Sequence, residues 1–116
     1  MSTESPASGV RARSSESVHV VAPRGELDLL SVIDVRAALA ERPDPCELVV
    51  LDLRDLTFFD TSGIRLVVET MQELRAAGVR FAILRGSEDV QRLFAIARME
   101  DRLPFFDALD EAIAAR

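Results

Sequence analysis

One stretch of this chain constrains its fold more than any other. Residues 48–53, Leu-Val-Val-Leu-Asp-Leu, form a nearly continuous apolar run bounded by Glu47 and Arg54. A short run of this kind is typical of a strand that is buried on both faces, as in a parallel sheet covered by helices. A chain of 116 residues can bury such a strand without disulfides or metals, so we expect a single domain.

The segments around this run alternate between strand and helix patterns. Strands are predicted, from β-branched or aromatic content, over residues 17–22, 79–85 and 103–106. Helices are predicted, from the spacing of apolar side chains, over residues 29–41, 64–77, 88–97 and 108–115. Such alternation favours parallel strands joined by right-handed helical crossovers. We therefore expect an α/β fold with a mixed sheet of four to five strands and all helices packed on one side of it.

The helix predicted over residues 29–41 begins beside two residues that can accept hydrogen bonds from its free N–H groups. Asp28 or Ser31 is expected to cap it. Its apolar residues include Leu30 and Ile33, and it ends before Pro43 because the residue preceding a proline disfavours helical geometry.

The first 16 residues are rich in serine and poor in large apolar side chains. This composition predicts a mostly disordered tail over residues 1–16 and places the folded domain over residues 17–116. Residues 10–13, however, alternate between apolar and polar side chains, so an edge strand there that pairs with the next strand is an open alternative.

Charge and cysteine content exclude several classes of partner and ligand. The net charge of −6 argues against a nucleic acid or an anionic membrane, since both bind basic surfaces. With one cysteine, Cys46, and one histidine, His19, an internal disulfide is excluded and a structural zinc site is not expected. No uncharged apolar stretch is long enough for a signal peptide or a membrane span. A cytoplasmic location is therefore expected, and a single cysteine suits a reducing compartment.

The sequence matches known catalytic motifs only weakly. Ser62 lacks the flanking glycines of a nucleophile elbow, and His19 is the only histidine that could act as its base. The glycines match no phosphate-binding loop, and the chain has no lysine. Paired carboxylates are also used by glycosidases, but turn formation is the more common role of the acidic residues near strand ends, Glu26, Asp28, Asp52, Asp55 and Asp60. We expect no enzyme, no catalytic residue, no metal and no cofactor.

Ser62 has two other interpretations, because it precedes the helix expected from about residue 63. In the first, its hydroxyl only caps that helix. In the second, the residue is phosphorylated, since the N–H groups and dipole of a helix N-terminus favour anions. A phosphate would add a charge of about −1.5 to −2 to an exposed surface and could end the docking of a partner without unfolding the domain. Both interpretations stay open on this argument.

Three segments together resemble a known family. They are Gly25-Glu-Leu-Asp28, then Leu51-Asp-Leu-Arg-Asp-Leu-Thr-Phe-Phe-Asp-Thr-Ser-Gly-Ile64, and Val90-Gln-Arg-Leu-Phe94 on the next-to-last predicted helix. Their order and separation resemble the STAS domain of bacterial anti-sigma-factor antagonists over about residues 17–115. The Asp-Thr-Ser-Gly turn after a Leu-Asp-Leu strand is the most specific part of this resemblance.

The resemblance implies a function and a switch. Members of the family bind an anti-sigma factor that is also a serine kinase, and binding releases a sigma factor. The kinase then phosphorylates the turn and ends the complex, and a metal-dependent serine phosphatase reverses the modification. Carried over to this chain, the phosphorylated residue is Ser62, with Thr61 as the second choice because the family also has a two-serine version of this motif.

The resemblance also implies a partner surface at one end of the sheet, composed of Glu26, Asp28, Phe58, Asp60, Thr61, Ser62 and Gly63. Phe58 and Phe59 are neighbours, so in a strand they point to opposite faces. Either both are buried at the strand end, or one reaches the surface near Ser62. The alternatives to the switch are a non-switching STAS scaffold and a small-molecule or nucleotide-binding STAS module, and a weak homodimer is left open.

Overall fold

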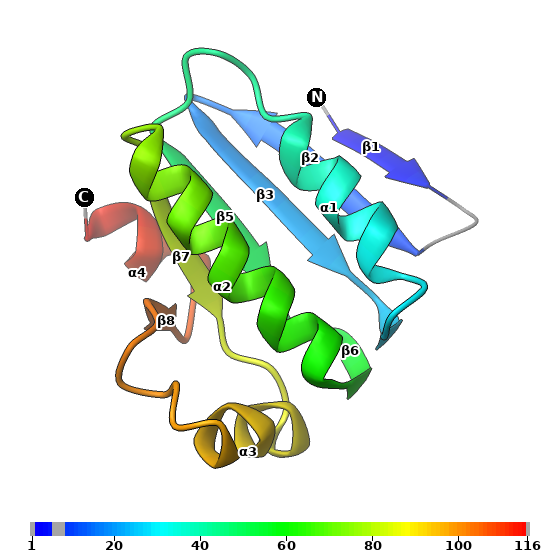
Figure 1. The fold of residues 1–116 in the computed structure, drawn as a ribbon. Helices are drawn as coiled ribbons and strands as arrows, with labels where there is room; N and C mark the ends of the chain where they lie inside the picture. The colour runs from blue at the N-terminus through cyan, green and yellow to red at the C-terminus, as the bar shows by residue number, and fades with distance from the viewer. Residues whose placement is uncertain (1, 6–8, 116) are drawn as a thin grey trace.

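The apolar run that dominates the sequence lies in the middle of the sheet in the computed structural model (Figure 1). It forms β5 (Leu48–Asp52), whose residues are all buried. β5 pairs in parallel with β3 (Val18–Pro23) on one side and with β7 (Arg80–Leu84) on the other. The structure describes residues 2–5 and 9–115.

Six strands form the main sheet, in the order β1-β2-β3-β5-β7-β8. The outer strands are β1 (Ser2–Ser5), β2 (Val10–Ser15) and β8 (Phe105–Phe106). β1, β2 and β3 pair antiparallel, whereas β3, β5, β7 and β8 pair in parallel, so the sheet is mixed as predicted. β1 adds one edge strand to the four or five that we expected.

The N-terminal part of the sheet settles the alternative that the sequence left open at residues 10–13. These residues belong to β2, in which Val10 and Ala12 are buried while Arg11 and Arg13 face outward. The boundary expected between residues 16 and 17 falls within the tight turn that joins β2 to β3. Residues 1 and 6–8, on which the expectation of a disordered tail also falls, lie outside the described residues.

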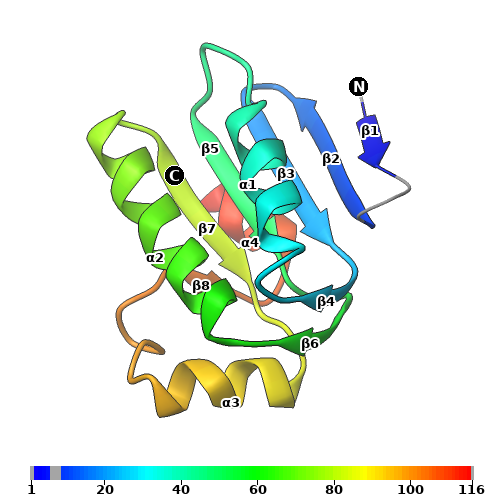
Figure 2. The same ribbon diagram turned by 45° about the vertical axis from the view of Figure 1, so that its right-hand side comes forward.

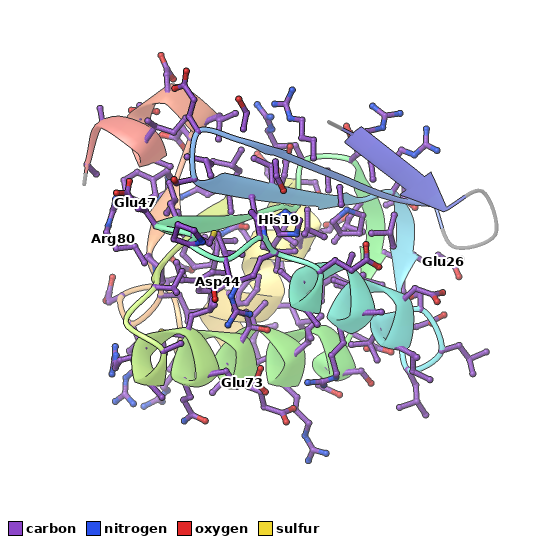
Figure 3. All side chains as sticks on the ribbon, turned by 90° about the horizontal axis from the view of Figure 1, so that it is seen from above. His19, Glu26, Asp44, Glu47, Glu73 and Arg80 are labelled. Atoms are coloured by element: carbon purple, nitrogen blue, oxygen red, sulfur yellow. The ribbon has the colours of Figure 1, made fainter. Side chains whose placement is uncertain are left out.

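The helices cover both faces of the sheet unequally. α1 (Val32–Ala40) and α2 (Thr61–Ala76) lie side by side on one face, as expected, and α3 (Glu88–Ile96) packs at the end where the parallel strands finish (Figures 1 and 2). The last helix, α4 (Leu109–Ala114), differs from the prediction because it packs on the opposite face (Figure 3). It covers Val50 and the other apolar residues that point away from α1 and α2.

A second, two-stranded sheet that the sequence analysis did not predict forms at the end of the main one. β4 (Gly25–Leu27) pairs in parallel with β6 (Leu56–Phe59), so that Glu26 lies opposite Phe58. Figure 2 shows this pair beyond the ends of β3 and β5, between α1 and α3. The pairing brings together the two loop segments that carry the family motif.

The central position of β5 can be tested with Val50→Asp. Val50 is fully buried between Val20 and Ala82 of the neighbouring strands, beneath α4. An unpaired carboxylate there should cost several kcal/mol against a total stability of about 5–15 kcal/mol, so the variant should be largely unfolded by circular dichroism and thermal melting.

The matched control for that substitution is Ala37→Asp, because Ala37 is exposed on α1. It should keep a cooperative thermal transition. An equally cooperative transition for Val50→Asp would contradict the assignment of β5 as the buried centre of the sheet.

Candidate functional site

The Asp-Thr-Ser-Gly turn forms the start of α2, and its aspartate is the helix cap. Asp60 is extended, and its carboxylate accepts a hydrogen bond from the Ser62 N–H at 2.9 Å. The helix begins at Thr61, earlier than predicted, so Ser62 is its second residue. The interpretation of Ser62 as the cap is therefore wrong. Since Asp60 meets the need for a capping acceptor, the Ser62 hydroxyl is not needed for it, and the side chain lies half-buried at the surface.

Gly63 has a packing role instead of the surface role that we expected. It is buried, and a Cβ atom at this position would collide with the ring of Phe59. That ring is in turn edge-on to Phe94 of α3, with centroids 5.0 Å apart, and Phe94 is edge-on to Phe105 of β8. The missing side chain of Gly63 thus lets the first turn of α2 lie directly on the aromatic core. Gly63 can influence a partner only through the position of its neighbours.

The turn before α1 is held by a reciprocal pair of side chains. The Asp28 carboxylate accepts hydrogen bonds from the N–H groups of Leu30 and Ser31, both at 3.0 Å. The Ser31 hydroxyl accepts from the Asp28 N–H at 2.9 Å and donates to the Glu26 carbonyl at 2.8 Å. These bonds, above all the one from the Ser31 N–H, lower the pKa of Asp28. Neither side chain caps α1 in the expected way, because α1 starts only at Val32.

The structure brings the predicted site segments together. Besides the pairing of Glu26 with Phe58, the Asp60 N–H donates to the Leu27 carbonyl at 3.3 Å. Glu26 points outward at the end of the molecule where α1 begins (Figure 3). Thr61 is also exposed, whereas Asp28, Asp60 and Ser62 are half-buried. Residues from two separate stretches of sequence, 26–28 and 58–62, therefore share one end of the sheet.

Four large apolar side chains border this end and are exposed to solvent. Phe58 is 49% exposed whereas Phe59 is buried. Of the two arrangements considered for these rings, the structure has the one in which one ring lies in the core and the other reaches the surface. Leu29, Leu30 and Ile33 are 70%, 79% and 66% exposed. We call Leu29, Leu30, Ile33 and Phe58 the apolar patch. Such a patch beside polar residues is typical of a protein–protein contact surface.

Sequence reasoning missed three members of the apolar patch, although a signal was present. Leu30 and Ile33 were counted toward the helix prediction, but the buried face of α1 is formed by Val32, Val35, Ala38 and Leu39. Ile33 falls outside that stripe, and Leu30 lies in the turn that precedes the helix. A helix with apolar residues on two sides needs cover on both, which indicates a partner for the second side.

Beside the apolar patch, a groove of about 560 Å³ separates the first turns of α1 and α2. It is lined by Leu29, Val32, Arg36, Thr61, Ser62, Arg65 and Glu69. One ion pair crosses it, from Arg36 to Glu69 at 3.4 Å. Neither arginine was a candidate in the sequence analysis, because only the fold brings α1 beside α2.

The residues considered for catalysis lie elsewhere or are engaged in local contacts. His19 is 3% exposed on β3, where Nε2 donates to the Ala38 carbonyl at 2.9 Å and Nδ1 lies 2.6 Å from the Ser14 hydroxyl (Figure 3). It faces the last turn of α1, while Ser62 lies beside the first. Asp52 forms a two-pronged ion pair with Arg54, which raises the pKa of that arginine.

Within ranges 2–5 and 9–115, no group of three or more His, Cys, Asp or Glu side chains is arranged to hold a metal ion. In the same ranges, no helix has the length and apolar character needed to cross a membrane.

With this geometry established, comparison with known proteins identifies the class. The chain belongs to the STAS-domain family, whose model matches residues 10–112. Osmosensory protein A of Mycobacterium tuberculosis is 33% identical over 89 residues, which are 72% of this chain and 53% of that protein. The chain thus spans about half the length of that relative. The predicted family and the predicted STAS fold are confirmed.

Other relatives are named for the control of sigma factors. The anti-sigma-B factor antagonist of Staphylococcus aureus is 26% identical over 93 residues, covering 79% of this chain and 86% of that protein. The structure of the anti-sigma factor antagonist SpoIIAA in its unphosphorylated form matches with a TM-score of 0.72 at 26% identity, covering 90% of this chain and 92% of the other. An anti-sigma factor antagonist from Mycobacterium paratuberculosis matches with a TM-score of 0.77 over 97% of both chains, at 21% identity. This last likeness concerns the fold alone.

The contact between Gly63 and Phe59 can be tested with a double-mutant cycle. Gly63→Ala should lower the free energy of unfolding by about 1–3 kcal/mol, because the new methyl group must displace the Phe59 ring. In a Phe59→Leu background, which has a smaller side chain, the same substitution should cost much less. Guanidinium unfolding of the four proteins measures the coupling. Strictly additive losses would show that the two residues do not oppose each other.

Proposed function

We propose that this protein is an anti-sigma-factor antagonist that docks on an anti-sigma factor through the end of the sheet that carries β4, β6 and the first turns of α1 and α2. The observation that carries the proposal is the arrangement at α2. Asp60 caps the helix, which leaves the Ser62 hydroxyl free in a groove beside the apolar patch. The apolar patch and the Ser62 hydroxyl, which can be modified, therefore lie next to each other.

The physical basis for docking is the unpartnered apolar area. Leu30 and Ile33 are mostly exposed. Burial of apolar surface is favourable by about 25 cal/mol per Å², so covering these side chains would stabilise a complex. The exposed groups around them, including Glu26 and Thr61, form a polar rim. An apolar centre with a polar rim is the usual composition of a protein contact surface. The partner is the anti-sigma factor that the family relationship suggests.

The proposed switch is phosphorylation of Ser62 by that anti-sigma factor acting as a serine kinase. The γ-phosphoryl group of ATP passes to the Ser62 Oγ, which loses its proton, and ADP leaves. A metal-dependent phosphatase then hydrolyses the phosphoserine. The new charge lies at the rim of the apolar patch, where docking would have to remove its water, and this desolvation weakens the complex. Thr61, the exposed first residue of α2, is the second choice. Since sigma factors act on RNA polymerase, we place the protein in the cytoplasm.

The docking surface can be tested by exchanging one exposed leucine. Leu30→Ser should weaken binding of the anti-sigma factor by roughly tenfold or more, since a central apolar contact contributes more than about 1 kcal/mol. Ile96→Ser is the matched control, because Ile96 on α3 is 71% exposed but lies outside the apolar patch. Titration calorimetry with the purified anti-sigma factor measures both. Equal affinity for both variants and the parent protein would exclude the apolar patch from the interface.

The switch requires its own experiment. The protein is incubated with the anti-sigma kinase and ATP, and the modified residue is mapped by mass spectrometry. Phosphate is expected on Ser62, and Ser62→Ala should bind normally but resist modification, while Thr61→Ala should still be modified. Phosphate on Thr61 alone would move the switch by one residue. No phosphate on either residue, in the presence of a partner that binds, would reject the switch and favour the non-switching scaffold or the ligand-binding module.

A further inference from the structure

The groove beside Ser62 contains two guanidinium groups that come from different helices. Arg65 follows Ser62 by one helical turn, so the two side chains share one face of α2. Arg36 reaches the groove from α1. The fold therefore places two arginines along the groove that Ser62 also lines, in a chain whose net charge is −6.

These two cations are only partly neutralised. Arg36 pairs with Glu69 at 3.4 Å, but the two side chains are 45% and 43% exposed, so water weakens this ion pair. Among the described residues, Arg65 has no ion-pair partner. The residues that line the groove therefore carry an excess of positive charge, which favours a further anion.

The helix N-terminus alone cannot fully serve a phosphate here. The N–H of Ser62 is already bonded to the Asp60 carboxylate at 2.9 Å. That carboxylate also brings a negative charge to the end of the helix, where it opposes a second anion. A phosphate on Ser62 would therefore depend on the arginine side chains for compensation. Guanidinium groups suit this role because they bind phosphate oxygens through two parallel hydrogen bonds.

We propose that Arg65 and Arg36 bind the phosphate of modified Ser62 within the same molecule. This inference rests on the proposed function, since it presumes that Ser62 is the modified residue. On phosphorylation Arg36 leaves Glu69, and the phosphate links α1 to α2 across the groove. The modification then acts by filling the groove and occupying both arginines, in addition to adding charge. Arg65 and Arg36 are positioning residues for the phosphate and have no role in its transfer.

The inference can be tested without a kinase. The full-length chain is produced with phosphoserine incorporated at position 62, and the phosphate is titrated by ³¹P NMR. Two neighbouring guanidinium groups should hold its second pKa about 0.5–1 below the ordinary value near 6, despite the opposing carboxylates of Asp60 and Glu69. Arg65→Gln and Arg36→Gln should each raise this pKa, and Arg65→Lys should restore part of the effect.

The matched control is Arg75→Gln, on the same helix but lining a different cavity, which should leave the phosphate pKa unchanged. A second pKa at or above the ordinary value, unaffected by Arg65→Gln and Arg36→Gln, would overturn the inference. That result would leave the proposed function intact, because partner binding and kinase modification are measured separately. Conversely, a lowered pKa in a protein that no kinase modifies would support the binding of phosphate by the arginines while the proposed switch fails.

Discussion

The parallel pairing of β5 with β3 and β7 buries all five of its residues, and the first four have no exposed area. A strand in this position must have apolar cover on both faces, because a buried and unpaired polar group would be costly. α1 and α2 provide the cover on one face and α4 provides it on the other. The parallel strands also finish at a common end, and the chain leaves them there through short loops. The burial of β5 therefore determines where those loops can lie.

The loops that leave β3 and β5 form the site because they pair with each other. β4 and β6 hold them in register, and Phe59 of β6 anchors that pair against α3 and the first turn of α2. Two aspartates of the family motif form hydrogen bonds within these loops. Asp28 fixes the turn before α1, and Asp60 caps α2. What remains outward is the Ser62 groove and the apolar patch, and these are the parts to which we assign function.

Much of this could be predicted from local sequence patterns. The apolar run of β5, the helical spacing of α2 and α3, and the aromatic edge strand all depend on neighbours within a few residues. The position of Ser62 at a helix start also came from local pattern. Of the two interpretations of Ser62, the capping role is wrong, because Asp60 is an equally good capping acceptor and only the backbone geometry distinguishes them.

Features that depend on distant pairing could not be predicted in the same way. β4 and β6 are too short to be recognised alone, and each exists because the other is opposite. The position of α4 depends on which face of the sheet α1 and α2 leave open. Ile33 lies on the side of α1 that faces solvent, and Leu30 lies in the turn before α1, outside the helix predicted to include it. The arginines of the groove became visible only when two helices were placed side by side.

The anchoring of α2 on the Phe59 ring has a kinetic consequence. Since Gly63 and Phe59 hold the first turn against the core, the surface that we propose for docking is already formed in the chain alone. Encounter then requires no slow rearrangement of this chain, and the association rate is set by diffusion, orientation and long-range charge. The lifetime of a complex would be governed by the contacts at the surface alone. A cell could therefore change the response time of such a protein by altering surface side chains, without touching its core.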